Sequence, residues 1–280
     1  MRLSQGIDYD HVVFYAMTQI CMKAGMQRWG KPATEAVSTE LEQLHYRDTF
    51  KPVNHCSLSK KEYEKLLESH LLLKQKRNES IKGRMVAGGN KQRGTIDKDN
   101  AASPTAALES VLLISTIDVA EERDSSLIDI PNSFIQTSIK NDEDKVFLRL
   151  RGKLADLLIK TAPEIYRKHI TINRKGETVL YVRALNAIYG IMKAALLFYQ
   201  KFVGDLMTIG IELNPYNPCV ANKTINSKQL TLIWHVDDIK ASHVEAEVVT
   251  RMEKWLSKTY ELLFKEVSGK MKFCRGKVHD

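Results

Sequence analysis

The sequence predicts an α+β fold built on an antiparallel sheet. With 280 residues, 43% of them hydrophobic, the chain can bury a core of one or two domains. Strand-like and helix-like stretches follow one another, and two strand patterns near the C-terminal end are joined only by a short polar turn. No internal repeat or low-complexity tract interrupts this order.

The first third of the chain is expected to hold two helices and a strand. The first helix, near 34–46, has apolar residues at helical spacing, and Pro52 is expected to end that unit. The second helix begins at a capping box formed by Ser59 and Glu62. Its apolar stripe comprises Tyr63, Leu66, Leu67 and Leu71. A strand is expected at 81–87.

The middle of the chain is expected to place an aspartate at the end of a strand. Ser103 and Pro104 supply an N-cap and a first-turn proline for a helix that runs to about residue 117. Residues 126–130 form a short buried strand pattern that Pro131 stops. Asp129 therefore lies where this strand ends.

The remaining elements follow in a regular order. They are strands at 146–150 and 178–183, a helix at 191–209 that Gly210 terminates, strands at 218–222 and 229–234, a helix at 245–258 and a strand at 260–267.

The net charge of +8 favours polyanionic partners such as nucleic acid. Part of this surplus lies in a basic run from Lys74 to Arg93, although such a run is more often a solvated face than a site. The four cysteines are far apart and form no metal-ligand or disulfide pattern. No apolar run of about 20 residues or signal-peptide core is present, so an intracellular location, cytoplasmic or nuclear, is expected without a membrane partner.

The pair Asp237-Asp238 is the most informative feature of the sequence. It follows a β-favouring run that ends at Val236 and precedes Ile239, which predicts a tight turn between two strands. Adjacent carboxylates repel each other unless a cation neutralises them, so the pair indicates a divalent metal site. Asp129 could supply a third ligand, although an isolated pair of aspartates is more often only a polar hairpin tip.

Several segments, in order, resemble the reverse transcriptase domain of copia-type (Pseudoviridae) LTR retrotransposon polyproteins. The resemblance covers about residues 35–280. The matching segments are IKGRMVA at 81–87, DIPNSFIQ at 129–136, AIYGIMK at 187–193, the aromatic pair Phe198-Tyr199, NPCV at 217–220 and WHVDD at 234–238.

The resemblance implies a polymerase fold of fingers and palm, with an antiparallel palm sheet flanked by helices. It implies an N-terminal extension and helix at 1–50, fingers at 51–125, a palm at 126–245, and at 246–280 the end of the palm with the start of an incomplete thumb. Because the chain stops at Asp280 without ribonuclease H, integrase or protease segments, a truncated element is expected.

The resemblance also implies roles for single residues. Asp129, Asp237 and Asp238 would be the catalytic ligands of two Mg²⁺ ions, or of Mn²⁺. Phe134 would lie beneath the sugar of the incoming deoxynucleoside triphosphate and exclude a 2′-hydroxyl. Four further residues would contribute to nucleotide binding: Arg84 and Lys82 at the triphosphate, and Tyr189 and Gly190 at the start of the helix that supports the templating base.

The sequence departs from the family pattern in two places. Pro131, Asn132 and Ser133 stand where family members usually have small or polar residues that end in Ala before the aromatic residue. Residues 194–197 read AALL where many members have Pro-Arg-Ala. The loss of that arginine weakens any template contact carried over from the family.

Two main readings follow for the function. The first is an RNA-directed DNA polymerase that acts on an RNA or DNA template-primer by two-metal nucleotidyl transfer. Its further expected partners are other segments of a retroelement polyprotein. The alternative is an inactive, truncated retroelement remnant that binds nucleic acid through phosphate contacts without catalysis. A metal-dependent nuclease would explain the carboxylates but neither Phe134 nor the basic strand.

Overall fold

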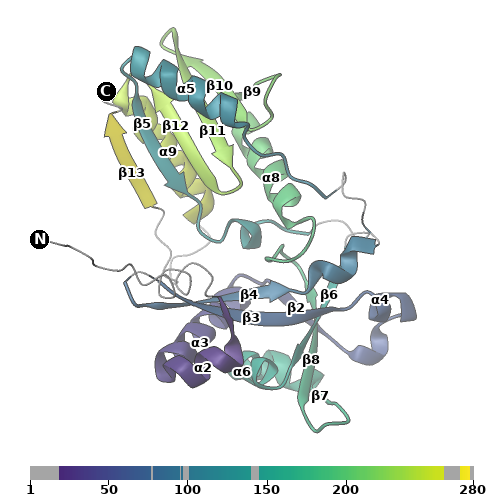
Figure 1. Ribbon diagram of the computed structural model, residues 1–280. Helices are drawn as coiled ribbons and strands as arrows, with labels where there is room; N and C mark the ends of the chain where they lie inside the picture. The colour runs from purple at the N-terminus through teal and green to yellow at the C-terminus, as the bar shows by residue number, and fades with distance from the viewer. Residues whose placement is uncertain are drawn as a thin grey trace, which may run out of the picture. The chain divides into compact units, whose positions relative to one another are not determined.

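The computed structural model describes residues 19–76, 78–94, 96, 101–139, 145–261 and 272–277. The chain divides into two compact units, each made from two stretches of sequence (Figure 1). The first unit comprises residues 1–89 and 145–184, and the second comprises 90–144 and 185–280. Each unit combines helices with a largely antiparallel sheet, which confirms the α+β class. The division is discontinuous, whereas the segments expected for fingers and palm are continuous.

The first unit is built on a sheet with the order β1-β3-β6-β8-β2, in which β4 also pairs with β3 and β7 with β8. Only the β3–β6 pair is parallel among its described strands. The strands are β1 (Ile20–Cys21), β2 (Phe50–Val53), β3 (Leu67–Gln75), β4 (Ile81–Ala87), β6 (Val146–Arg151), β7 (Thr171–Ile172) and β8 (Thr178–Ala184). The helices are α2 (Met22–Trp29), α3 (Lys31–Tyr46), α4 (Lys60–Glu64), α6 (Lys153–Thr161) and α7 (Pro163–Tyr166), with 3₁₀ turns at His55–Ser57 and Arg167–His169.

Helix α3 packs unusually closely on strand β4. A Cβ atom at Gly83 would lie 2.8 Å from the backbone oxygen of Ala36, so only glycine fits at this point of the strand. One turn along the helix, the buried carboxylate of Glu40 accepts a hydrogen bond of 2.9 Å from the amide of Met85. The predicted strand at 81–87 is confirmed, and its glycine is explained by the helix that covers it.

Two expectations for this unit were wrong. The capping box of Ser59 and Glu62 is present, but α4 ends at Glu64, and Leu67 and Leu71 lie on the buried side of strand β3. A spacing of four residues fits both a helical face and one face of a strand, so the apolar stripe did not distinguish them. Pro52 does not end a unit, because it lies within β2, at the edge of the sheet where proline is tolerated.

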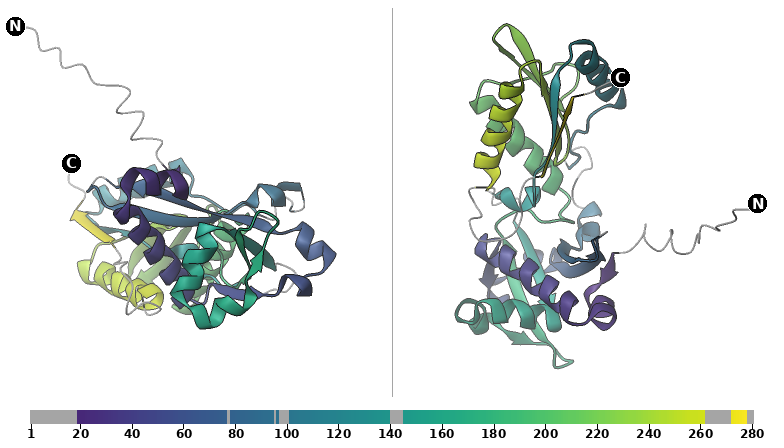
Figure 2. Two further views of the ribbon diagram at one scale, coloured as in Figure 1. Left: turned by 90° about the horizontal axis from the view of Figure 1, so that it is seen from below. Right: turned by 90° about the vertical axis from the view of Figure 1, so that its left-hand side faces the viewer.

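The second unit is an antiparallel sheet with the order β13-β5-β12-β11-β10-β9. The strands are β5 (Asp124–Asp129), β9 (Glu212–Leu213), β10 (Val220–Ile225), β11 (Lys228–His235), β12 (Asp238–His243) and β13 (Lys272–Lys277). The helices are α5 (Leu108–Ala120), α8 (Ala194–Thr208) and α9 (Ala246–Glu261), with 3₁₀ turns at Gly89–Gly94 and Ser133–Gln136. Helix α5 lies on one face of the sheet and α8 and α9 on the other (Figure 2).

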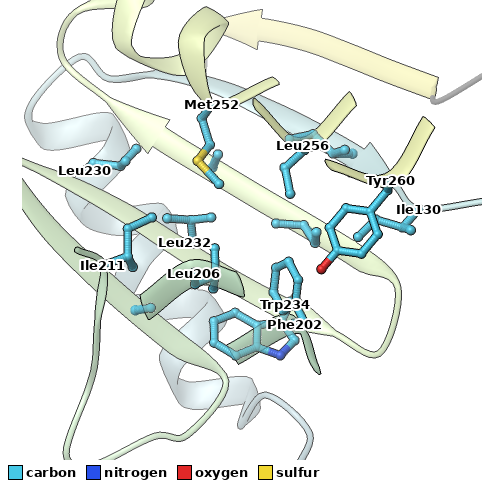
Figure 3. Close-up of a cluster of buried hydrophobic side chains, with 14 of the residues drawn as sticks. Ile130, Phe202, Leu206, Ile211, Leu230, Leu232, Trp234, Met252, Leu256 and Tyr260 are labelled. Carbon is cyan, nitrogen blue, oxygen red and sulfur yellow. The ribbon is translucent and has the colours of Figure 1, made fainter. Parts of the chain in front are cut away.

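The core of this unit lies between the sheet and helices α8 and α9. The indole of Trp234 meets the ring of Phe202 edge-on, with 5.2 Å between ring centroids (Figure 3). Tyr260 of α9 is completely buried and donates a hydrogen bond of 2.7 Å from its hydroxyl to Asp205 Oδ2. Burial and this hydrogen bond to a carboxylate raise the pKa of the Tyr260 phenol. The aromatic side chains thus fix the sheet face that is opposite to α5.

Several expected elements of this unit are confirmed with shifted ends. The helix expected from Ser103 begins at Leu108, since residues 102–107 form no regular structure, and the long helix begins at Ala194 rather than near residue 191. Tyr260 belongs to α9 and not to a strand, while residues 262–267 lie outside the described residues. Among the helices of the described ranges, none is long and apolar enough to cross a membrane.

Candidate active site

Asp129 and Asp238 are paired across two neighbouring strands. Asp129 is the last residue of β5 and stands opposite Asp238, the first residue of β12. The amide of Ile130 donates to the carbonyl of Asp237 at 3.1 Å, so the next pair along, Asp129 and Asp238, is a non-hydrogen-bonded pair. In such a pair the Cα atoms are about 4.5 Å apart and the two side chains lie on the same face of the sheet.

A two-residue turn, Val236-Asp237, joins β11 to β12 directly before Asp238. His235 pairs with Asp238, so Val236 and Asp237 are the turn residues. The expected tight turn is confirmed, but it contains only the first aspartate of the doublet, because Asp238 already begins β12. Val236 has a φ of 58°, a left-handed conformation that a β-branched residue rarely adopts. Strained backbone of this kind is found preferentially at functional sites, where neighbouring structure holds it in place.

The carboxylate pair has the chemistry of a cation site. Asp129 and Asp238 are exposed, and within the described part of the chain neither forms an ion pair or a side-chain hydrogen bond. Two like charges in a close cross-strand pair destabilise the sheet unless a cation binds between them. Carboxylate oxygens are preferred ligands of Mg²⁺, so these residues fit such an ion. In the described ranges no three His, Cys, Asp or Glu side chains are grouped closely enough to hold a metal.

Phe134 is held near the end of β5 by a short 3₁₀ turn. This turn, Ser133–Gln136, begins after Asn132, which has a φ of 54°. The Nε2 atom of Gln136 donates a hydrogen bond of 2.8 Å to the Pro131 carbonyl. The half-buried ring of Phe134 lies beside that of Tyr189, with 4.7 Å between centroids. The structure therefore brings two of the predicted nucleotide-site residues into contact.

Tyr189 and Gly190 lie in a turn before helix α8, which corrects the expectation that they begin the helix. Gly190 has a φ of 89°, a conformation that favours glycine, and the chain does not become helical until Ala194. In the intervening turn the amide of Met192 donates to Gln92 Oε1 at 3.0 Å. The glycine is thus required by the turn itself, and Tyr189 is oriented by its contact with Phe134.

Lys82 and Arg84 belong to the first unit, where they share one face of strand β4. They alternate with the buried residues Gly83 and Met85, so both side chains are on the face away from α3. Lys82 is exposed and Arg84 is half-buried. Their face of the sheet carries a second lysine, since Lys82 is the register partner of Lys74 on β3.

Sequence reasoning overlooked a buried charge network near the carboxylate pair. Lys240 lies two residues after Asp238 on β12, and its ammonium is 2.7 Å from the carboxylate of Asp118 on α5. The alternation of the strand predicts that Lys240 shares a face with Asp238. No local pattern could indicate Asp118, because its position depends on how α5 packs over the sheet.

The sequence matches the protein family described as reverse transcriptase (RNA-dependent DNA polymerase) over residues 47–275. The chain belongs to the reverse transcriptase family. Asp129, Asp237, Asp238 and Phe134, together with the basic strand β4, all lie in the matched region of this reverse transcriptase domain.

Comparison with solved structures finds telomerase from Candida albicans, in a complex with the TWJ fragment of telomeric RNA. The TM-score is 0.40 at 10% identity, and the match covers 88% of this chain and 46% of the telomerase chain. The match thus spans less than half the length of the telomerase chain. The comparison with curated proteins gave no match.

Proposed function

We propose that this chain is an RNA-directed DNA polymerase domain of a copia-type retrotransposon, which extends a primer on an RNA or DNA template by two-metal nucleotidyl transfer. The observation that carries the proposal is the close cross-strand pair of Asp129 and Asp238, with Asp237 in the adjoining turn, in a chain of the reverse transcriptase family. The copia-type assignment is supported by the ordered motifs of the sequence.

The carboxylates would hold the catalytic ions. Asp129, Asp237 and Asp238 would supply the oxygen ligands, and the ions, when bound, would activate the primer 3′-hydroxyl and stabilise the leaving pyrophosphate. The protein's own contribution would be to hold Asp129 and Asp238 in register on adjacent strands, with Asp237 in the turn that precedes Asp238. Positions on paired strands are more precise than positions on long loops, as a two-ion site requires.

Phe134 would select deoxynucleotides. Its ring follows Asp129 by five residues, is fixed by a 3₁₀ turn and is supported by Tyr189. A rigid aromatic side chain beside the sugar would leave no room for a 2′-hydroxyl, and the contact with Tyr189 would keep the ring from moving aside.

Basic residues of both units would bind phosphate. Arg84 could contact the triphosphate through two parallel hydrogen bonds, with Lys82 acting as a point charge. Lys74, Lys76, Lys91 and Arg93 of the basic run are exposed, whereas Arg77 lies outside the described residues. These side chains support binding to a template-primer, whose affinity should then decrease steeply with salt.

The test is primer extension by the 280-residue chain on a primed RNA template with Mg²⁺ or Mn²⁺. Asp237→Asn should abolish extension and leave template-primer affinity nearly unchanged, because it removes a metal ligand and no phosphate contact. Asp156→Asn, on α6 of the first unit, is the matched control and should extend normally. Binding without extension by the wild-type chain would support the noncatalytic alternative.

Phe134→Ala tests the selectivity separately. The variant should incorporate ribonucleotides and keep part of its deoxynucleotide incorporation, because the space beside the sugar is opened while the carboxylates remain. If ribonucleotides stay excluded, Phe134 has only a packing role against Phe198, whose ring centroid is 6.4 Å away.

A further inference from the structure

Lys240 is a cation built into the sheet face that carries the carboxylate pair. Strand β12 alternates between buried Ile239 and Ala241 on one face and Asp238 and Lys240 on the other. Lys240 pairs with Leu127 on β5, one step along the face from the pair of Asp129 and Asp238. Diagonal neighbours of this kind have Cα atoms about 7–8 Å apart, which is within reach of a lysine side chain.

The Lys240 ammonium is directed to helix α5 instead. Its Nζ lies 2.7 Å from Asp118 Oδ2 and donates to Ser115 Oγ at 3.3 Å. The Asp118 side chain is fully buried, at 0% exposure, and that of Lys240 is 17% exposed. A buried carboxylate without a partner would be strongly destabilising, so Asp118 attracts the ammonium more strongly than a solvated carboxylate can.

Of the two basic residues in this network, Lys240 lies closer to Asp118 than Arg123 does. Arg123 is also buried, but it contacts Glu121 at 2.9 Å and donates to Thr231 Oγ1 at 3.0 Å, whereas its distance from Asp118 is 3.9 Å. The network therefore contains two acids and two bases. Each acid of the network has a basic partner only while Lys240 remains paired with Asp118.

We propose that Asp118 is a positioning residue that holds the Lys240 ammonium away from Asp129 and Asp238 and so keeps this carboxylate pair available for a divalent cation. The inference rests on the proposed function of the pair. Without the charge of Asp118, the Lys240 side chain would swing along its own sheet face to the nearest carboxylates. It would then neutralise them and repel an incoming metal ion.

A purely structural ion pair is the alternative, and it differs in a measurable way. Buried pairs often contribute little net stability, and removing one partner is costly mainly because the other charge is left unpaired. Both roles predict a less stable Asp118→Asn protein. Only the positioning role predicts that metal affinity falls in this variant and returns when Lys240 is removed as well.

The experiment is a double-mutant cycle on the Mn²⁺ affinity of the full chain, measured from the electron paramagnetic resonance signal of free Mn²⁺. Asp118→Asn should bind Mn²⁺ about two- to fivefold more weakly, the size expected for one competing exposed ion pair. Lys240→Met alone should change the affinity less than twofold, because Lys240 is already held away. The double variant should bind like the wild type.

Asp205→Asn is the matched control for the loss of an ion-paired aspartate. Asp205 pairs with Lys201 at 2.6 Å on helix α8, which lies across the sheet from Asp118, so its loss should leave Mn²⁺ affinity unchanged. Asp238→Asn reports on the metal site itself and should lose affinity whatever the role of Asp118.

Three results would overturn the inference. The first is unchanged affinity in Asp118→Asn, and the second is a double variant as weak as that single variant. The third is tighter Mn²⁺ binding by Lys240→Met alone, because this would mean that Lys240 already competes with the metal in the wild type. This third result does not depend on whether an Asp118 variant folds. If the wild type binds no Mn²⁺, the proposed metal site fails and this inference with it, whereas metal binding without coupling in the cycle rejects this inference alone.

Discussion

Asp129 and Asp238 face each other in a non-hydrogen-bonded pair between strands β5 and β12, the closest register that two side chains on neighbouring antiparallel strands can have. This relationship joins two motifs that are about a hundred residues apart in the sequence. It also explains why the doublet must be placed by a tight turn, since a shift of the register by one residue would move Asp238 to the other face.

Val236 is expected to be replaceable by glycine without loss of stability. A left-handed φ costs an L-residue about 1–2 kcal/mol, whereas glycine in a strand costs about 0.5–1 kcal/mol in chain entropy. Urea denaturation of Val236→Gly should therefore show a free energy of unfolding that is unchanged or up to about 1 kcal/mol higher. Val86→Gly, at a half-buried valine of β4 without positive φ, is the control and should lose about 1–2 kcal/mol. Equal losses in the two variants would mean that the turn is not strained.

Neighbouring apolar residues of helix α5 are expected to differ in their contribution to stability. Ile114 is buried against Val220 and Ile233 of the sheet, whereas Leu112 is 60% exposed. Ile114→Ala should lower the free energy of unfolding by about 2 kcal/mol or more, and Leu112→Ala should change it by less than about 0.5 kcal/mol. Similar losses at both sites in thermal or chemical denaturation would contradict the observed packing of α5.

Helix α5 also illustrates what the sequence could not predict. The helix has apolar residues on all sides, so their spacing does not indicate which face is buried. Neither its contact with the sheet nor the partner of Asp118 could therefore be inferred. The hairpin of β10 and β11 was predictable from its polar turn, in which Asn226 and Ser227 both adopt positive φ. Helix α6 could have been found from Leu154, Leu157 and Leu158, which are spaced for one helical face, yet it was overlooked. The parallel pairing of β3 with β6 joins distant segments and leaves no local signal.

Glu40 is expected to make the stability of the first unit depend on pH. Burial raises the pKa of this carboxyl above its ordinary value of 4.5, although the Met85 amide and nearby cations oppose the shift. Above pH 4.5 the unfolded chain releases this proton while the folded chain retains it, so stability decreases as the pH rises through the folded pKa. Below pH 4.5 both states are protonated and the contribution is constant.

Glu40→Gln should therefore flatten the decline in stability above pH 4.5, as measured by denaturation at several pH values. Glu42→Gln, at an exposed position of the same helix, should keep the wild-type slope. Parallel slopes for all three proteins would show that the Glu40 carboxyl does not retain its proton in the folded state.

The most direct test of the central claim is the melting temperature with and without Mg²⁺, compared between the wild type and Asp238→Asn at constant ionic strength. Without metal, the variant should melt at a higher temperature, because it lacks one of the two negative charges that face each other across the strands. Addition of Mg²⁺ should raise the melting temperature of the wild type, since an ion that binds only the folded state stabilises it, and should leave that of the variant almost unchanged. A wild type that does not respond to Mg²⁺, or a variant that responds equally, would contradict the assignment of Asp129 and Asp238 as metal ligands.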